Sequence, residues 1–186
     1  MEIVLASASP RRKELLSLIT EHFTVCPADA DETLRDAPLG EEVTRLSRLK
    51  AEAVQAQHPN AVCIGSDTMV TIDGLRLGKP KDADEAASML RRLRGRTHEV
   101  LTGLAVLTPD GGAHTLPTCT RVTFRDFAED ELAAYLATGE PLDKAGAYGI
   151  QGHGALLIKG IEGDYYSVMG LPVAPLYTIL RDIHAV

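Results

Sequence analysis

The sequence predicts a single α/β domain in which helices cover both faces of a central mixed, twisted sheet. Short apolar runs typical of buried strands alternate with segments of helical spacing, which is the pattern of an α/β fold. The 186 residues suffice for one domain with a substantial core but are few for two. Because no repeat, low-complexity segment or linker interrupts the chain, we expect one domain over residues 1–186.

Strand and helix signals alternate in the first third of the chain. Residues 3–6 form a short apolar run, and residues 12–19 have helical spacing with their apolar side chains on one face. Residues 23–26 predict a second strand, and the acidic, turn-rich segment 27–38 predicts a loop. An apolar stripe at helical spacing then predicts a long helix over 40–57.

The middle of the chain predicts a buried strand, a hairpin and a helix. Residues 61–65 are a continuous apolar run of the kind found in buried strands. Residues 69–77 alternate around Asp73-Gly74, which is a strong signal for a tight hairpin turn. Residues 84–93 begin with acidic and end with basic side chains, as a helix prefers.

The last third of the chain predicts further strands and two helices. Residues 100–107 and 118–124 are expected to pair as strands on either side of a Pro-Asp-Gly-Gly turn. Residues 129–137 predict a short helix that a glycine ends. Residues 155–161 predict another strand, and residues 173–183 a closing helix.

Composition excludes several classes of function. The net charge of −7 disfavours nonspecific binding to nucleic acid, which needs a basic surface. We find no signal peptide and no apolar stretch long enough to span a bilayer, so we expect a cytoplasmic protein without a membrane partner. Cys26, Cys63 and Cys119 stand in apolar, strand-like contexts without metal-ligand spacing, and we expect buried free thiols.

The turn between the first strand and the first helix carries the strongest signal for an anion site. Ser9 is a natural N-cap and Pro10 a natural first helical residue. Arg11, Arg12 and Lys13 follow, and cations at a helix N-terminus cost stability unless an anion neutralises them. Acidic side chains are one source of that anion. We favour a bound phosphate, held by free backbone N–H groups and a guanidinium.

A carboxylate and two lysines are further candidates. Asp67 is expected at the carboxyl end of the predicted buried strand, where open α/β sheets bind ligands. Near phosphates such a carboxylate ligates Mg²⁺ or acts as a base toward water, whereas its structural alternative is to cap a turn. Lys79 stands on a constrained Gly-Lys-Pro turn suited to hold a phosphate. For Lys50, spacing alone leaves a solvated and a functional role open.

The segment 143–152 is rich in glycine, so that its backbone is able to approach a ligand closely. Asp143 and Lys144 at its start are candidates for a local ion pair. None of the histidines has a partner at ligand spacing, and we assign them no role. Because GxxxxGK[ST] and a GxGxxG after the first strand are both absent, P-loop and dinucleotide-binding folds are disfavoured.

Taken together and in order, these segments resemble the Maf family of nucleoside triphosphate pyrophosphatases over nearly the whole chain. Each piece alone is weak, but the ordered set is highly specific. The matching pieces are Ala6-Ser7-Ala8-Ser9-Pro10-Arg11-Arg12, Asp31-Glu32, Lys50-Ala51, Gly65-Ser66-Asp67-Thr68, Gly78-Lys79-Pro80, the run over 97–103, the run over 143–152, Gly163-Asp164-Tyr165 and Gly170-Leu171-Pro172.

The resemblance implies an α/β fold of the Maf and inosine-triphosphatase type and hydrolysis of a nucleoside triphosphate between its α and β phosphates. It implies a divalent metal cation (Mg or Mn), a cytoplasmic location, a homodimer, and a historical link to septum formation. By the same resemblance, Asp67 is the proton acceptor and Glu32 is an acidic residue near the metal. We assign both Asp67 and Glu32 as ligands of the metal. Lys50 and Lys79 are implied to act in catalysis on the phosphates. The substrate-binding residues assigned on the matched motifs are Ser7, Ser9, Arg11, Arg12, Thr68, Lys144 and Gln151.

Within the family, Arg12, Thr68 and Gln151 match the branch that acts on dTTP and UTP. A glutamine amide offers one carbonyl and one NH₂ group, so Gln151 is able to pair with N3–H and a neighbouring oxygen of uracil or thymine. Arg12 only donates, which suits O2 or O4 and leaves the amino group of cytosine unsatisfied. Two departures from the usual motif, at Ser66 and over 166–169, affect fine specificity. The alternatives are a non-hydrolysing nucleotide-binding regulator of cell division and a pyrophosphatase for deaminated purine triphosphates.

Overall fold

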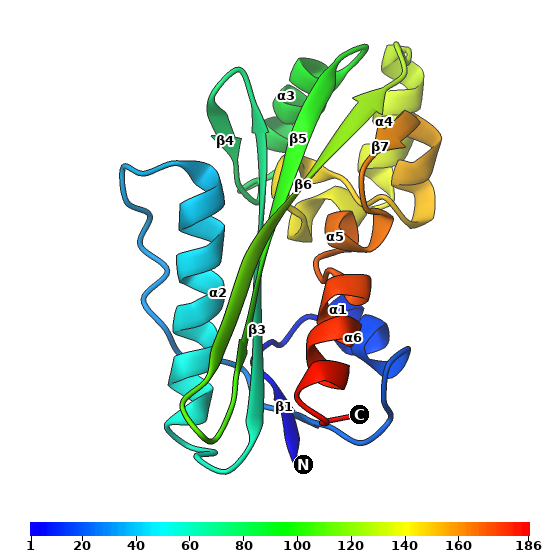
Figure 1. Cartoon of the computed structure of the whole chain (residues 1–186). Helices are drawn as coiled ribbons and strands as arrows, with labels where there is room; N and C mark the ends of the chain where they lie inside the picture. Colours follow the sequence, from blue (N-terminus) through cyan, green and yellow to red (C-terminus); the bar gives the residue numbers. More distant parts are fainter. The chain divides into compact units, whose positions relative to one another are not determined.

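The computed structural model describes residues 1–186 and has the expected α/β architecture with a mixed sheet (Figure 1). The strand order is β2-β1-β3-β5-β6-β7, and β4 pairs with β3 off this path. β1 pairs in parallel with β2 and β3, whereas β4 lies antiparallel to β3 and β7 antiparallel to β6. The strands are β1 (Ile3–Leu5), β2 (Thr24–Val25), β3 (Val62–Ile72), β4 (Leu75–Leu77), β5 (Thr97–Leu107), β6 (Ala113–Phe124) and β7 (Ile158–Glu162).

Helices begin and end close to the predicted positions. Asp82 caps the third helix by accepting the backbone N–H of Glu85 at 2.8 Å. Gly139, with a φ of 72°, follows the fourth, as a left-handed residue commonly does at a helix end. No helix combines the length and the apolar character needed to cross a bilayer. The helices are α1 (Pro10–Ser17), α2 (Leu39–Gln55), α3 (Ala83–Leu93), α4 (Glu129–Ala137), α5 (Tyr165–Met169) and α6 (Val173–Asp182), with the 3₁₀ turns η1 (Glu140–Asp143), η2 (Ala145–Ala147) and η3 (Gly152–Leu157).

The chain divides into two compact units, to each of which the long strands β3, β5 and β6 contribute one part. The first unit comprises Met1–Thr68, Thr102–Thr118 and Gly170–Val186. The second comprises Met69–Leu101 and Cys119–Met169. The expectation of one domain over residues 1–186 stays a prediction.

In the first unit, helices lie on both sides of the strands, as expected. α2 lies on one side and α1 and α6 on the other (Figure 1). α2 approaches β3 very closely, because a Cβ added at Gly65 would lie 2.0 Å from the Ser47 carbonyl oxygen. Successive β3 side chains point to opposite faces, so the residues after Gly65 alternate between the two layers.

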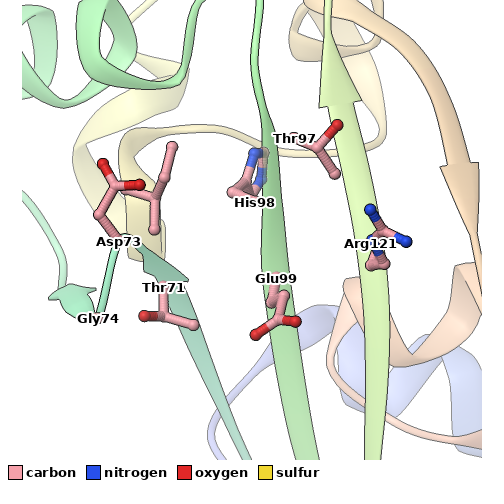
Figure 2. A pocket seen from close by; sticks show the side chains of 8 residues that line it. Thr71, Asp73, Gly74, Thr97, His98, Glu99 and Arg121 are labelled. Carbon is pink, nitrogen blue, oxygen red and sulfur yellow. The ribbon is translucent and has the colours of Figure 1, made fainter.

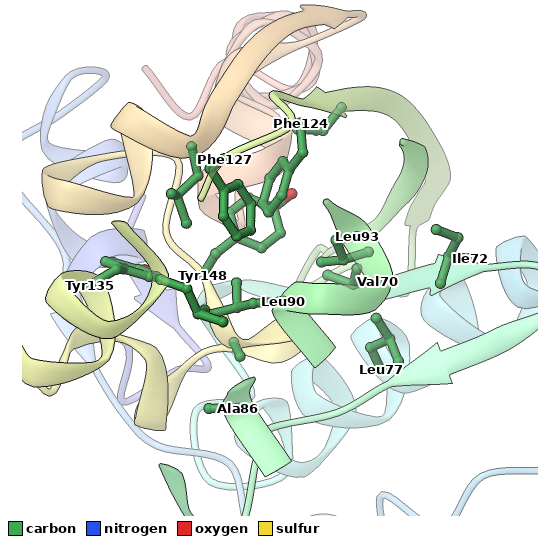
Figure 3. Close-up of a cluster of buried hydrophobic side chains, with 14 of the residues drawn as sticks. Val70, Ile72, Leu77, Ala86, Leu90, Leu93, Phe124, Phe127, Tyr135 and Tyr148 are labelled. Carbon is green, nitrogen blue, oxygen red and sulfur yellow. The ribbon is translucent and has the colours of Figure 1, made fainter. Parts of the chain in front are cut away.

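The second unit has its own apolar core around α3, α4 and the parts of β3, β5 and β6 that belong to this unit (Figure 3). Phe124 and Tyr148 meet edge to face with ring centroids 4.7 Å apart. The His98 ring contacts Phe124 in the same way at 5.1 Å. Aromatic rings in such arrangements contribute beyond their buried area, so this cluster stabilises the unit.

His98 makes the stability of the protein depend on pH. Only 2 % of the residue is exposed, and burial lowers its pKa from 6.5 to about 4. Because the unfolded chain then takes up the proton first, stability is present above pH 6.5 and is lost as pH falls toward 4. At 1.36 kcal/mol per pKa unit, the full loss is about 3 kcal/mol.

Urea unfolding of the parent and of His98→Gln at pH 7.5, 6 and 5 measures this loss. We expect a smaller decline of the unfolding free energy with falling pH in His98→Gln than in the parent. The exposed His114 provides the control, since His114→Gln is expected to keep the parent's decline. If the unfolding free energy declines equally with pH in all three proteins, His98 is not the source of the pH dependence.

Three local predictions are wrong. The strand expected over 61–65 continues to Ile72, so that Asp67 lies within β3 and not at its carboxyl end. The strand expected over 155–161 is the 3₁₀ turn η3 as far as Leu157 and β7 only from Ile158, the residue that pairs with Phe124 at the end of β6. Of the thiols expected to be buried, only Cys63 is; Cys26 is half-buried and Cys119 exposed. Cys119 belongs to the part of β6 whose side chains remain largely exposed.

Candidate functional site

The predicted anion site lies where β1 turns into α1. Ser9 is the N-cap and Pro10 the first residue of α1, but the Ser9 side chain makes no capping hydrogen bond. The Ser9 backbone N–H instead donates to the Ser7 hydroxyl at 3.2 Å. Arg11 is half-buried and has no hydrogen-bond or ion-pair partner within the chain. The beginning of α1 therefore keeps a cap hydroxyl and a cation for a ligand.

Arg12 is held by neutral acceptors. Its Nε donates to the Gly170 carbonyl oxygen at 2.8 Å, and its Nη1 lies 3.3 Å from the Ser7 hydroxyl. Its Nη2 reaches the Thr68 hydroxyl at 3.5 Å, and that hydroxyl lies 3.1 Å from the Thr102 hydroxyl. Burial lowers the pKa of the guanidinium, which the nearby carboxylates partly offset. Arg11 and Arg12 thus have different surroundings.

Lys50, whose role the sequence left open, is a buried cation between two carboxylates. Its Nζ lies 2.6 Å from Asp67 Oδ1 and 2.9 Å from Glu32 Oε2. Lys50 and Asp67 are each only 8 % exposed, whereas Glu32 is exposed. A solvated lysine on a helix surface would have neither this burial nor these partners. The structure therefore brings Glu32, Lys50 and Asp67 together.

Asp67 and Thr68 reach different layers from neighbouring positions on β3. Asp67 points to Lys50 on α2, and Thr68 contacts Arg12 on α1. Their positions lie beyond the end of β1, which pairs with β3 only as far as Leu5 opposite Ile64. Asp67 and Thr68 thus follow the carboxyl end of β1, whereas the predicted location at the end of β3 is wrong because β3 continues to Ile72.

The loop that carries Glu32 is held by a buried carboxylate that the sequence reasoning missed. Glu42 is fully buried and accepts the backbone N–H of Arg35 at 2.9 Å. Arg45 pairs with Glu42 and donates to the Thr33 carbonyl oxygen at 2.9 Å. These hydrogen bonds, Arg45 foremost, lower the pKa of Glu42 to about 2 despite its burial. The signal in the sequence was a Glu and an Arg at i and i+3 on one helix face.

The implied divalent cation fits the donor set of this site. No group of three or more His, Cys, Asp or Glu side chains is suited to a metal ion. Glu32 and Asp67 nevertheless both lie within 3 Å of one cationic atom, Lys50 Nζ. Mg²⁺ in nucleotide enzymes is usually held by one or two carboxylates together with substrate phosphates and water. Two carboxylates that converge in this way meet that requirement.

The remaining predicted residues belong to the second unit. Lys79 is exposed on the turn after β4 and has no partner within the chain. Lys144 Nζ donates to Asp143 Oδ1 at 2.6 Å, the expected ion pair, and to the Glu140 carbonyl oxygen at 2.7 Å. Gln151 is half-buried, and its amide has no partner within the chain. Ser7, Ser9, Arg11, Arg12, Glu32, Lys50, Asp67 and Thr68 all belong to the first unit.

The second unit also contains a pocket of about 210 Å³ that includes none of the predicted site residues (Figure 2). Two of the residues that line it have buried polar atoms without a hydrogen-bond partner, namely Thr71 Oγ1 and His98 Nδ1. The other His98 nitrogen lies 2.7 Å from the Tyr148 hydroxyl. This contact links the pocket wall to the glycine-rich segment that carries Gln151.

Comparison with known proteins gives full-length matches. A dTTP/UTP pyrophosphatase of Bacillus velezensis is 51 % identical over 183 residues, which is 98 % of this chain and 96 % of that protein. A dTTP/UTP pyrophosphatase of Moorella thermoacetica is 50 % identical over 96 % of this chain and 93 % of its own. Among solved structures, the Staphylococcus aureus Ham1 protein aligns with a TM-score of 0.49 at 19 % identity, over 68 % of this chain and 73 % of that one.

The family match covers the residues that build the site described above. The profile of the Maf-like protein family matches residues 2–183, from before β1 to beyond the end of α6. Every predicted site residue lies within that range. The chain belongs to the Maf-like protein family.

Proposed function

We propose that this chain is a nucleoside triphosphate pyrophosphatase that hydrolyses dTTP and UTP to the monophosphate and pyrophosphate. The observation that carries the proposal is the buried pair of Lys50 on α2 and Asp67 on β3, whose charged atoms are 2.6 Å apart. The residue after Asp67 on β3, Thr68, contacts Arg12. Asp67, a carboxylate for water, and Arg11, a cation for phosphates, belong to the same unit. The names of relatives that are 51 % and 50 % identical over nearly the whole chain support the substrate.

In this proposal, Asp67 accepts the proton of the attacking water or orients that water. Lys50 holds the Asp67 carboxylate in place through Oδ1, which leaves the other oxygen for the attacking water. Arg11 and Lys79, which have no partner within the chain, bind the phosphates and stabilise the charge that builds on the leaving pyrophosphate. Asp67 and Glu32 would hold a divalent cation, which would supply Lewis-acid polarisation of the α-phosphate and of the attacking water.

The proposal assigns recognition of the substrate's nucleobase to Arg12, Thr68 and Gln151. Arg12 is fixed by the Gly170 carbonyl oxygen at 2.8 Å, which orients its remaining N–H groups. The Gln151 amide is unpaired and therefore available to a base that offers both a donor and an acceptor. Ser7, Ser9 and Lys144 complete the proposed substrate contacts. A cytoplasmic location and a homodimer belong to the same proposal, on the support of the family resemblance.

A substrate panel tests the proposal. The protein is incubated with UTP, dTTP, CTP, ITP and XTP in the presence of Mg²⁺ or Mn²⁺, and pyrophosphate is measured. We expect kcat/KM for UTP and dTTP to exceed the other values at least about tenfold, since a site built to hydrogen-bond its substrate discriminates strongly. EDTA is expected to abolish turnover. Preference for ITP or XTP indicates instead a pyrophosphatase for deaminated purines, and binding of UTP without pyrophosphate release indicates a nucleotide-binding regulator.

A further inference from the structure

We propose that Tyr135 and Glu140 are positioning residues for base discrimination, because together they fix the backbone on both sides of Gln151. The inference rests on the proposed function, in which the Gln151 amide recognises uracil or thymine. Neither Tyr135 nor Glu140 touches the substrate in this proposal. They act through the loop over 149–154.

Glu140 anchors the loop on the carboxyl side of Gln151. Its Oε2 accepts the backbone N–H of His153 at 2.9 Å, and its Oε1 accepts that of Gly154 at 3.2 Å. The Glu140 side chain is only 17 % exposed, so these hydrogen bonds are shielded from water. Burial raises its pKa, but the two backbone N–H groups and the Tyr135 hydroxyl outweigh that effect and lower it. The carboxylate is therefore ionised at neutral pH and accepts strongly.

Tyr135 anchors the other side. Its hydroxyl donates to Glu140 Oε1 at 3.0 Å and accepts the backbone N–H of Gly149 at 3.2 Å. The residue is 3 % exposed and belongs to α4, whose side chains pack in the core of the second unit. Because α4 is a rigid element, the hydroxyl gives the loop a fixed point of attachment.

The loop is shaped to these two side chains. Gly152 has a φ of 68°, and a Cβ there would lie 2.7 Å from Glu140 Oε2. A Cβ at Gly154 would lie 2.8 Å from the Tyr135 hydroxyl and 2.2 Å from the Gly149 carbonyl oxygen. The absence of side chains at both glycines therefore lets the backbone reach the two anchoring groups.

Gln151 stands between the two anchored points and makes no hydrogen bond of its own within the chain. Its backbone, at φ −94° and ψ 169°, fixes the direction in which the side chain leaves the loop. A side chain that discriminates by one donor and one acceptor must be held within a fraction of an ångström to reject the wrong base. Loosening either anchor is expected to cost discrimination more than turnover.

The test compares Tyr135→Phe and Glu140→Gln with the parent in steady-state hydrolysis of UTP and CTP. We expect the ratio of kcat/KM for UTP to that for CTP to fall at least tenfold in each variant. The change is expected mainly in KM for UTP, with kcat for UTP within threefold of the parent. Glu129→Gln is the matched control. Glu129 is a carboxylate of α4, the helix of Tyr135, and it pairs with Arg91 and Arg94 and does not touch the loop.

Double variants separate positioning from general loosening of the fold. In a Gln151→Ala background the discriminating amide is gone, so adding Tyr135→Phe is expected to leave the UTP-to-CTP ratio unchanged. If Tyr135 had a purely structural role, adding Tyr135→Phe would lower the UTP-to-CTP ratio equally with and without Gln151. That result would overturn the inference, and so would a ratio equal to the parent's in both single variants. If the parent itself does not prefer UTP, the proposed function fails and this inference fails with it.

Discussion

Asp67→Asn is expected to lower kcat for hydrolysis of UTP and dTTP by about 10²- to 10⁴-fold, the usual contribution of a general base. Asparagine has nearly the same shape but cannot take a proton from water. Because asparagine still offers an oxygen to the cation and the other phosphate and nucleobase contacts are unchanged, nucleotide binding is expected to stay within about threefold of the parent. This is the pattern of a contribution made in the transition state only. Pyrophosphate release measures turnover, and calorimetric titration with a non-hydrolysable UTP analogue measures binding.

The fold of the variant has to be checked, because Asp67 is also a partner of a buried cation. Removing one member of a buried ion pair costs about 3 to 5 kcal/mol when the other is left alone. Here Lys50 keeps Glu32 at 2.9 Å, so a smaller loss is expected. Urea unfolding determines the loss directly, and activity is compared at a urea concentration where both proteins are folded.

Asp31→Asn is the matched control for the charge. Asp31 lies next to Glu32 in the same loop, but its carboxylate contacts Thr33 and not Lys50. An asparagine there keeps the side-chain oxygen that Thr33 donates to, so turnover is expected to stay near the parent value. If Asp67→Asn also hydrolyses UTP with a kcat near the parent's, Asp67 is not the base and the proposed mechanism is wrong.

Local rules account for the elements that the sequence predicts well. The Asp73-Gly74 turn has φ values of 53° and 76°, the left-handed pair that a two-residue hairpin requires. Ser9 and Pro10 mark the beginning of α1 because a proline at the first helical position needs no N–H partner. Such signals depend on two or three neighbouring residues and survive whatever the rest of the fold does.

Contacts between distant residues account for what local rules missed. The sequence predicts that the strand ends at Gly65, because the continuous apolar run ends there. Asp67 nevertheless lies within β3, because Lys50, 17 positions earlier and on another element, neutralises it. When the partner of a polar residue is distant in the sequence, the neighbouring residues do not indicate whether its side chain will be buried.

Sequence motifs name candidate site residues but do not give their geometry. The ordered motifs named Lys50, Asp67 and Glu32, and the structure brings these three together. They did not name Tyr135 and Glu140, which precede the glycine-rich segment and act through its backbone. A positioning residue is hard to recognise from a sequence motif, because its hydrogen bonds depend on where the fold places the backbone N–H groups.

Gly65→Ala is expected to lower the free energy of unfolding by at least about 3 kcal/mol, more than the usual cost of overpacking. A Cβ at this position would lie 2.0 Å from the Ser47 carbonyl oxygen and 2.9 Å from the Ala51 backbone nitrogen. Both are backbone atoms of α2, so no rotation of a side chain relieves the overlap. The helix would have to move away from β3 and take Lys50 with it.

A second glycine faces the same part of α2 from the neighbouring strand. A Cβ at Gly103 on β5 would lie 2.2 Å from the Val43 carbonyl oxygen and 2.5 Å from the Ser47 hydroxyl oxygen. Two glycines on adjacent strands thus let one helix lie against the sheet closely enough for Lys50 to reach Asp67. Gly103→Ala is therefore expected to destabilise the protein to a similar extent.

Urea unfolding followed by circular dichroism measures these losses, with Gly160→Ala as the control. Gly160 lies in the exposed strand β7 with nothing within 4 Å of an added Cβ, so its variant is expected to unfold within about 0.5 kcal/mol of the parent. Because moving α2 also separates Lys50 from Asp67, Gly65→Ala is expected to lose turnover even where it remains folded. A Gly65→Ala protein as stable and as active as Gly160→Ala would mean that α2 does not hold Lys50 against Asp67 through this close approach.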